Sequence, residues 1–339
     1  MKKINWFVVV GMMLLSACFV ACTDDDGGND SWDGDSAVVD AHDYDFWTYF
    51  DFETGTTKTL NVKSQEGGIL GMYKGDMTLK VNGKPSGEIN DVELIISHVS
   101  EDSVLLTVNE ITLKMGSMEM GPYTFSAKAG IKKEGDVWKL TGKESDYEGE
   151  DITFYGVKFD GTLGTTLSNS DQITVSFKPG EMPFSISATY TVTERDNKVY
   201  TLDGDESSFD WDIAFHKYDV KTNGGSVVKL NTTDLASVSL STVEGQSFTA
   251  DVNKSVMVDM SNMMQGFVGY MDTKVNEVLT GYLTATPTGS MPPYTYELNS
   301  NVFVVKMADG QYAKMRFTDY TNAKNQAVYA TFDYEFPLK

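Results

Sequence analysis

Residues 92–96 read VELII and residues 103–108 read SVLLTV, two short runs of branched aliphatic side chains. Runs of the same kind occur further along the chain, at 137–141 (VWKLT), 173–177 (ITVSF) and 185–190 (SISATY). Turn signals punctuate them, at Asn82-Gly83, Glu134-Gly135-Asp136 and Asp160-Gly161. Short strands separated by such turns predict antiparallel barrels or sandwiches, so we expect an all-β protein. The one helical pattern runs from Met271 to Leu279.

The composition of the chain disfavours several classes of protein. The 339 residues include 27 Lys and Arg against 49 Asp and Glu, a formal net charge of −22 at pH 7. Apolar residues make up 41%, enough to form the hydrophobic cores of about two domains. A protein that binds nucleic acid needs a basic surface, so we expect no nucleic acid partner. With two cysteines near the N-terminus and three histidines in all, a disulfide framework and a multi-histidine metal centre are both disfavoured.

Residues 1–22 are typical of a targeting segment. Two lysines precede an apolar stretch, residues 4–15, which is shorter than the ~20 residues that span a bilayer. Small residues then precede Cys18 and Cys22, and both sites resemble the lipobox of bacterial lipoproteins, in which a cysteine is acylated. We assign lipidation to Cys22, because the acidic TDDD that follows resembles the surface-export signal of Bacteroidetes lipoproteins. Cys18, whose flanking residues fit the bare lipobox better, is the alternative.

A secretory signal with incidental cysteines also remains open for this segment. Lipidation predicts a chain anchored by acyl groups in the outer membrane and exposed at the cell surface. Residues 23–43 are rich in Asp, Gly and Ser, and we expect them to form a flexible acidic tether.

Residues 65–190 form one predicted β unit. It begins with GMYKGDMTLKVNG (71–83), which resembles the start of the calycin-like β-barrel domains. Calycin relatives often hold an apolar ligand in the barrel. A small barrel filled by its own side chains is the commoner physical outcome.

Residues 209–225 read FDWDIAFHKYDVKTNGG and resemble the signature of the HmuY family of haem-binding lipoproteins. Residues 276–281 (NEVLTG) and 312–320 (YAKMRFTDY) agree with the same family. In that family an aromatic strand stands shortly before the signature, whereas here it occurs far upstream, at 47–55 (WTYFDFETG).

An insertion explains this separation. We predict an HmuY-like domain built from residues 44–64 and 191–339, interrupted by the calycin-like barrel at 65–190. Insertions are tolerated where two chain ends lie close together at a surface turn. Two sequential domains, with residues 47–55 in the first, remain the alternative.

Methionine is unusually frequent, with 17 copies, and five of them fall close together: Met257, Met260, Met263, Met264 and Met271. A thioether is a soft, neutral ligand that iron porphyrins accept. The HmuY resemblance implies two loops that each offer haem one axial ligand, His or Met. It places the first ligand in residues 261–267 and the second at Met291, and neither segment contains a histidine.

We therefore predict haem held by Met264 and Met291 as axial ligands, with Met263 as the substitute for Met264. Phe267 and Tyr294 are expected to line the porphyrin. On composition alone, a methionine cluster is most often a plain hydrophobic core or an adaptable interface, and we expect Met260 and Met271 to pack in this way.

The histidines and lysines are weaker candidates for site residues. His216 belongs to an alternating strand, where a structural role is expected, and His42 and His98 have no partner at ligand spacing. Lys254 and Lys274 flank the methionine-rich segment, but an exposed lysine contributes little.

No motif of a nucleophile elbow, a dinucleotide-binding loop or a zinc protease occurs, so we expect no enzyme. The resemblance implies a surface lipoprotein that captures haem and passes it to a TonB-dependent outer-membrane receptor. Two other functions remain open: a surface lipoprotein that binds lipid or another apolar ligand, and a structural or adhesive β protein.

Overall fold

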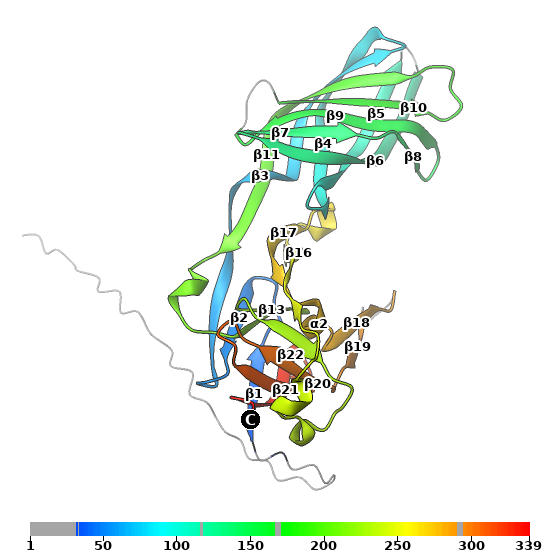
Figure 1. The fold of residues 1–339 in the computed structure, drawn as a ribbon. Coiled ribbons are helices and arrows are strands. Elements are labelled where there is room, and N and C mark those ends of the chain that lie inside the picture. The colour runs from blue at the N-terminus through cyan, green and yellow to red at the C-terminus, as the bar shows by residue number, and fades with distance from the viewer. Residues whose placement is uncertain (1–31, 33, 116–117, 167–170, 290–293) are drawn as a thin grey trace, which may run out of the picture. The chain divides into compact units, whose positions relative to one another are not determined.

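The computed structural model describes residue 32 and residues 34–339, except 116–117, 167–170 and 290–293. Cys18, Cys22 and Met291 therefore lie outside the described residues. Strands dominate the described chain (Figure 1), and the prediction of an all-β fold is confirmed. Residues 34–339 form one compact unit. Among the described residues, no helix is long and apolar enough to cross a membrane.

Eight described strands close an antiparallel barrel, in which each strand pairs with the next and the last returns to the first. Their bounds are Thr56–Val81 (β3), Lys84–Ser100 (β4), Ser103–Met115 (β5), Met118–Glu134 (β6), Val137–Gly142 (β7), Thr153–Gly164 (β9), Gln172–Pro179 (β10) and Ile186–Leu202 (β11). A short strand, β8 (Ser145–Glu148), pairs with β9. In β10, Ile173, Val175 and Phe177 are buried while the residues between them are not, which is the alternation that a strand with one covered face requires.

The barrel is filled by its own side chains. The ring of Phe125 contacts those of Phe154, Phe159 and Phe177, with centroids 4.7 to 6.3 Å apart. The buried Tyr190 hydroxyl donates a hydrogen bond to the carbonyl oxygen of Val92, at 3.1 Å. An apolar ligand inside the barrel would have to displace this packing, which argues against a lipid-binding interior.

One predicted turn is wrong. Asp160 and Gly161 lie inside β9, where Gly161 pairs with Ile173 of β10. A Cβ atom at Gly161 would stand only 2.3 Å from the carbonyl oxygen of Gln172. Gly161 therefore allows two backbones to approach closely. Because glycine occurs both in turns and at such close approaches, the sequence alone did not distinguish the two.

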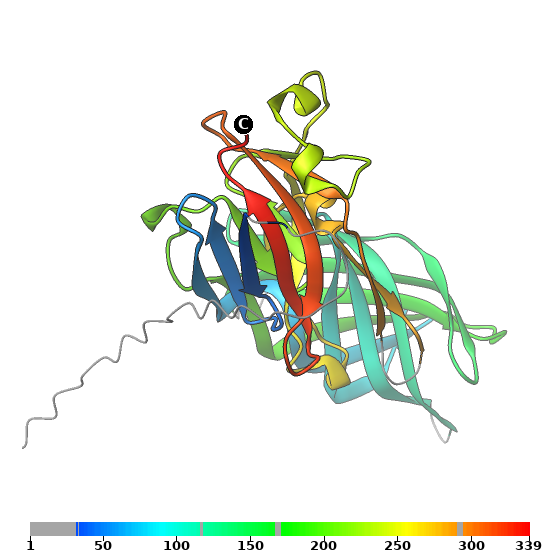
Figure 2. The same cartoon turned by 90° about the horizontal axis from the view of Figure 1, so that it is seen from below.

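A second sheet has the strand order β1-β22-β21-β20-β14-β15. Its strands are Asp35–Asp40 (β1), Ser226–Lys229 (β14), Thr249–Ala250 (β15), Val302–Lys306 (β20), Tyr312–Thr321 (β21) and Ala327–Glu335 (β22). Figures 1 and 2 show β1, β22 and β21 side by side. A shorter ladder of Phe46–Asp51 (β2), Ile213–His216 (β12) and Asp219–Thr222 (β13) shares a core with this sheet, for example through Phe50 and Phe332, whose ring centroids lie 5.2 Å apart.

Residues 35–40 differ from the prediction, which placed them in the acidic tether. They form β1 and pair with β22, so that Val39 and Ala41 are fully buried. The apolar stretch is only Ala37-Val38-Val39, too short to predict a strand among acidic neighbours.

The aromatic strand at residues 47–55 pairs within the HmuY-like part. Tyr49, on β2, lies opposite Ala214 of β12 on one side and Lys58 on the other. β3 and β11 then run side by side from Val62↔Leu202 to Val81↔Ile186, and so enter the barrel together (Figure 1). The interrupted arrangement requires this pairing, although the limits 44–64, 65–190 and 191–339 stay predictions.

The helical pattern from Met271 to Leu279 is largely wrong. Gly269–Val275 forms β17, and only Glu277–Thr280 is helical (α2). Asn276 caps this single turn, because its side-chain oxygen accepts a hydrogen bond from the Leu279 N–H at 3.0 Å. Val275 and Leu279 are buried, so the apolar spacing reports burial across a strand-to-helix junction.

Candidate functional site

The first predicted ligand lies at the end of a hairpin. β16 (Val252–Asp259) pairs with β17, and the loop between them contains a single 3₁₀ turn, Met263–Gln265. The side chain of Met264 is 89% exposed and that of Met263 is 48% exposed. Long apolar side chains are normally buried, so two neighbouring exposed thioethers are free to meet a ligand. Met271, by contrast, is buried in the core, as expected.

The second predicted ligand belongs to another hairpin. β18 (Leu283–Pro287) and β19 (Tyr294–Leu298) pair from Leu283↔Leu298 to Pro287↔Tyr294. Met291 stands in the loop between them, outside the described residues, so its distance from Met264 is not part of the described geometry. The pairing of Met264 with Met291 therefore stays a prediction. Figure 1 shows the two hairpins, which follow one another through α2.

Tyrosines form a cluster beside the second hairpin. The hydroxyls of Tyr218 and Tyr296 are 3.0 Å apart, and the ring of Tyr294 lies 6.5 Å from that of Tyr218. Burial raises the pKa of Tyr218, and its hydrogen bond to Tyr296 raises it further, so the phenol stays neutral. Tyr294 itself is 39% exposed, which leaves its ring available to a ligand.

Tyr44 and His216 connect this cluster to the first hairpin. The ring of Tyr44 is 6.4 Å from that of His216. Burial is the largest cause of the raised pKa of Tyr44, and the phenols of Tyr294 and Tyr296 raise it further. His216 is fully buried, with one ring nitrogen 2.8 Å from the carbonyl oxygen of Phe46 and the other 2.8 Å from that of Met257. The predicted structural role of His216 agrees with these contacts.

Sequence reasoning missed part of this cluster. The spacing of Tyr294 and Tyr296 could have predicted that both side chains lie on one face, because residues two apart in a strand share a face. Tyr218 lies within residues 209–225 but was not considered as a site residue. Tyr44 gave no signal, since it follows the segment interpreted as a tether.

Phe267 is only 3% exposed and sits beneath the methionine loop, where its N–H donates to the carbonyl oxygen of Asn262 at 3.1 Å. Gly266 closes this loop with a φ of +85°, a left-handed conformation that favours glycine. In this structure Phe267 therefore anchors the loop, and of the two predicted porphyrin contacts only Tyr294 offers an exposed face.

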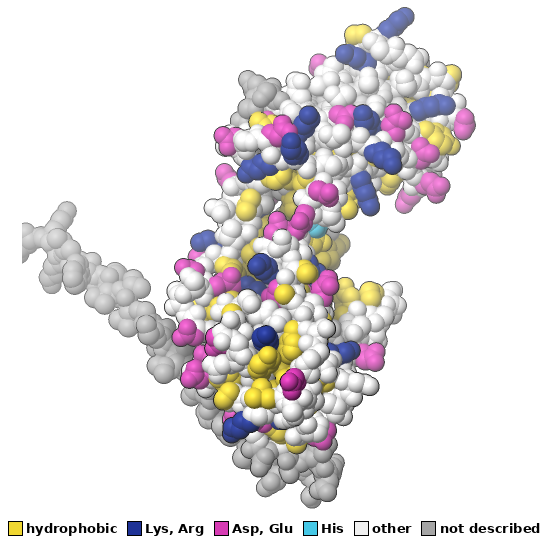
Figure 3. Space-filling model, viewed as in Figure 1, with side chains coloured by type: hydrophobic (Ala, Val, Ile, Leu, Met, Phe, Trp, Pro, Cys, Tyr) yellow, Lys and Arg dark blue, Asp and Glu magenta, His cyan; other side chains and the backbone are white. Residues whose placement is uncertain are grey.

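Positive charge near the hairpins is largely compensated. The Lys254 ammonium is 2.6 Å from Asp219. Lys217 lies with its nitrogen 4.5 Å from the centroid of the Tyr44 ring, and burial lowers its pKa. On the face that Figure 3 shows, basic and acidic side chains are interspersed.

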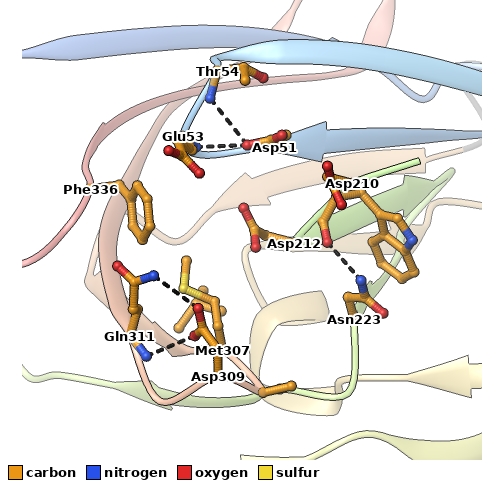
Figure 4. Close-up of a pocket in the computed structure, with 14 residues that line it drawn as sticks. Asp51, Glu53, Thr54, Asp210, Asp212, Asn223, Met307, Asp309, Gln311 and Phe336 are labelled. Atoms are coloured by element: carbon orange, nitrogen blue, oxygen red, sulfur yellow. Dashed lines mark hydrogen bonds between the residues drawn. The ribbon is translucent and has the colours of Figure 1, made fainter. Parts of the chain in front are cut away.

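A separate pocket of about 410 Å³ lies in the HmuY-like part (Figure 4). Its wall carries five acidic residues, Asp51, Glu53, Asp210, Asp212 and Asp309. Burial raises the pKa of Asp212, and the charges of Asp51, Asp309 and Glu53 raise it further. Such a wall repels an anionic ligand, so this pocket does not suit the carboxylates of haem. Within the described residues, no group of three or more His, Cys, Asp or Glu side chains is arranged to hold a metal ion.

These features define the class first: a β-rich protein in which a closed barrel accompanies a second β body with two hairpins, one of which exposes two methionines. Residues 166–334 match the family model described as HmuY protein, and residues 69–193 match that of the calycin-like beta-barrel domain. The chain therefore contains a region that matches the HmuY family and a calycin-like barrel domain, as the resemblance predicted.

Several solved structures are similar to this chain. A candidate HmuY-like haem-binding protein from Bacteroides vulgatus is 20% identical, with 90% of this chain and 92% of that chain covered and a TM-score of 0.42. Apo PinO from Porphyromonas gingivitis is 18% identical, with 91% and 99% covered and a TM-score of 0.46. The apo HmuY analogue of Tannerella forsythia is 20% identical, with 90% and 96% covered and a TM-score of 0.42. Similarities at this level do not transfer a function. No curated protein matches the sequence.

Proposed function

We propose that the chain is a haem-binding lipoprotein, which holds haem between hairpins β16–β17 and β18–β19 and passes it to a TonB-dependent receptor in the outer membrane. The observation that carries this proposal is the exposed thioether of Met264, at the end of a hairpin inside the region that matches the HmuY family. The role is one of binding and release, with no catalytic step.

Met264 and Met291 are the proposed axial ligands, with Met263 next to Met264 as the substitute. Two neutral sulfur ligands need no deprotonation, so the site is ready to bind at any physiological pH. Tyr294 supplies an aromatic face, and the hydroxyls around Tyr218 supply hydrogen-bond donors for a carboxylate.

The lipid anchor and the location are part of the same proposal. Acylation at Cys22, with Cys18 as the alternative, would hold the chain at the outer membrane facing the cell exterior. The acidic segment that follows would then act as a flexible spacer between the membrane anchor and the haem-binding domain. The filled barrel interior supports haem rather than lipid as the cargo.

A haem titration followed by absorbance tests the proposal. The wild type is expected to shift the Soret band of haem and to saturate. Met291→Ala and the double variant Met263→Ala/Met264→Ala should each weaken binding by about tenfold or more, since tenfold corresponds to ~1.4 kcal/mol.

Met182→Ala is the matched control, because Met182 is a partly buried methionine of the barrel, far along the chain from both hairpins. The proposal fails if the Met291 and Met263/Met264 variants bind haem like this control, with the same affinity and the same spectrum.

A further inference from the structure

The inserted barrel meets the methionine loop directly. Ser97, on β4, has its hydroxyl 3.4 Å from the carbonyl oxygen of Gly266. A Cβ atom at Gly266 would lie 3.5 Å from Cδ1 of Ile95, on the same strand. The loop that presents Met263 and Met264 is therefore seated on a barrel strand.

The next residue of that strand, His98, lines a groove of about 400 Å³ between the barrel and β17. Four side chains with rings line it, His98, Trp138, Tyr200 and Tyr270, together with aliphatic side chains such as those of Ile69 and Leu70. The rings of His98 and Tyr270 stand 4.6 Å apart at an interplanar angle of 33°. Pockets for small molecules typically measure ~300–1,000 Å³ and carry mainly apolar and aromatic walls, so this groove falls in their range.

His98 is suited to bind a metal. Burial lowers the pKa of its imidazole, against the opposing charge of Asp272, so the ring is neutral at pH 7. Within the described part of the chain, its ring contacts Tyr270, and no hydrogen bond occupies its nitrogens. A neutral imidazole with a free nitrogen is a common iron ligand.

We propose that this groove is a second binding site for an iron porphyrin, with His98 as an axial ligand, Tyr270 packed against the imidazole of His98, and Trp138 and Tyr200 in contact with the porphyrin. The site is distinct from the pair Met264 and Met291, and it rests on the proposed function only for the identity of the ligand. Lys133 and Lys198 also line the groove and can meet the porphyrin carboxylates, although the Lys198 ammonium lies 3.7 Å from Asp196, and the acidic Glu101 and Asp272 line the same groove. Recognition therefore depends on ring contact and iron ligation more than on net charge.

The full chain allows a direct test by stoichiometry. We expect the wild type to bind two equivalents of haem, one with thioether and one with nitrogen ligation in its absorption and electron paramagnetic resonance spectra. His98→Ala and the size-conserving His98→Gln should each lose one equivalent together with the nitrogen signature. The Met263→Ala/Met264→Ala variant should lose the other equivalent and keep the nitrogen signature.

His42→Ala is the matched control, because His42 is a partly exposed histidine that stacks on Tyr329 outside the groove. Metal-free protoporphyrin serves as a second probe, since it offers no iron to His98 and should bind the wild type and His98→Gln equally. Unchanged stoichiometry and spectra in both His98 variants overturn the second site. If only the methionine variants leave binding unchanged, the proposed methionine site fails while the groove stands.

Discussion

Asp212 shows how its surroundings set the chemistry of a single side chain. Its carboxylate accepts a hydrogen bond from the N–H of Phe52 at 2.8 Å, yet it lies in a pocket with four other acidic residues. Burial and the charges of Asp51, Asp309 and Glu53 raise its pKa in the folded protein. The folded chain therefore binds this proton more tightly than the unfolded chain, and stability falls as the pH rises between the two pKa values.

Asp212→Asn is expected to increase the free energy of unfolding at pH 7. The side-chain amide oxygen can still accept the hydrogen bond from the Phe52 N–H, and the substitution removes the negative charge. The gain should shrink toward about pH 4 and below, where the unfolded aspartate is also protonated. Denaturant unfolding at several pH values measures it, with the exposed barrel residue Asp136→Asn as control. A gain that is constant with pH would contradict this explanation.

Two thioethers should also give the proposed haem site a redox preference. Methionine ligands raise the reduction potential of haem iron relative to histidine. We expect ferrous haem to bind more tightly than ferric haem, by about tenfold or more, which corresponds to ~1.4 kcal/mol. Titrations with and without dithionite measure the difference, in the His98→Gln background so that only the methionine site is observed.

Met264→His provides the matched comparison, since an imidazole at the same position should reduce the preference for ferrous haem. Equal affinities for the two redox states in the protein with both methionines would rule out ligation by two thioethers.

Strand β9 carries a residue without a side chain at a point where the backbone of β10 comes close. Gly161 permits β9 to approach β10, whereas Gly130, in β6, has nothing closer than 3.6 Å to the position of a Cβ atom. Gly161→Ala is therefore expected to lower the free energy of unfolding by about 1–3 kcal/mol, as overpacking does.

Gly130→Ala should leave stability unchanged or raise it slightly, because alanine reduces the entropy of the unfolded chain. Thermal and denaturant unfolding of both variants provide the comparison. Equal effects of the two substitutions would show that the close approach at Gly161 is not what limits the barrel.

Other elements show which patterns are reliable. The strand around residues 173–177 was predicted well because alternation over a few residues reports one covered face. The strand around residues 92–96 was predicted from its run of branched aliphatic side chains, of which Leu94, Ile95 and Ile96 are all buried. β1 was missed because its burial depends on β22, almost three hundred residues later. The helical pattern at 271–279 failed because apolar spacing is ambiguous where a strand passes directly into one helical turn.

At the scale of the whole molecule, the proposed anchor determines where the protein works. Cys22→Ser is expected to abolish acylation and to release the chain from the membrane fraction, because the acyl chains contribute ~0.8 kcal/mol for each buried CH₂ group. Cys18→Ser should leave the acylation and the membrane association unchanged. Fractionation together with metabolic labelling by a fatty acid decides between them, and the opposite pattern would assign lipidation to Cys18.

Sequence by itself determined the β class, strands within β4, β5, β7, β10 and β11 of the barrel, and the resemblance to the HmuY family, because short apolar runs and motifs are encoded over a few neighbouring residues. It also named Met263 and Met264 as candidate ligands, whereas their exposure became evident only with the fold. Tertiary structure alone decided that Tyr218 meets Tyr296, and that His98 of the barrel lies against Tyr270 of the hairpin. These residues stand far apart in the chain, and only the pairing of long strands, which no local pattern records, brings them together.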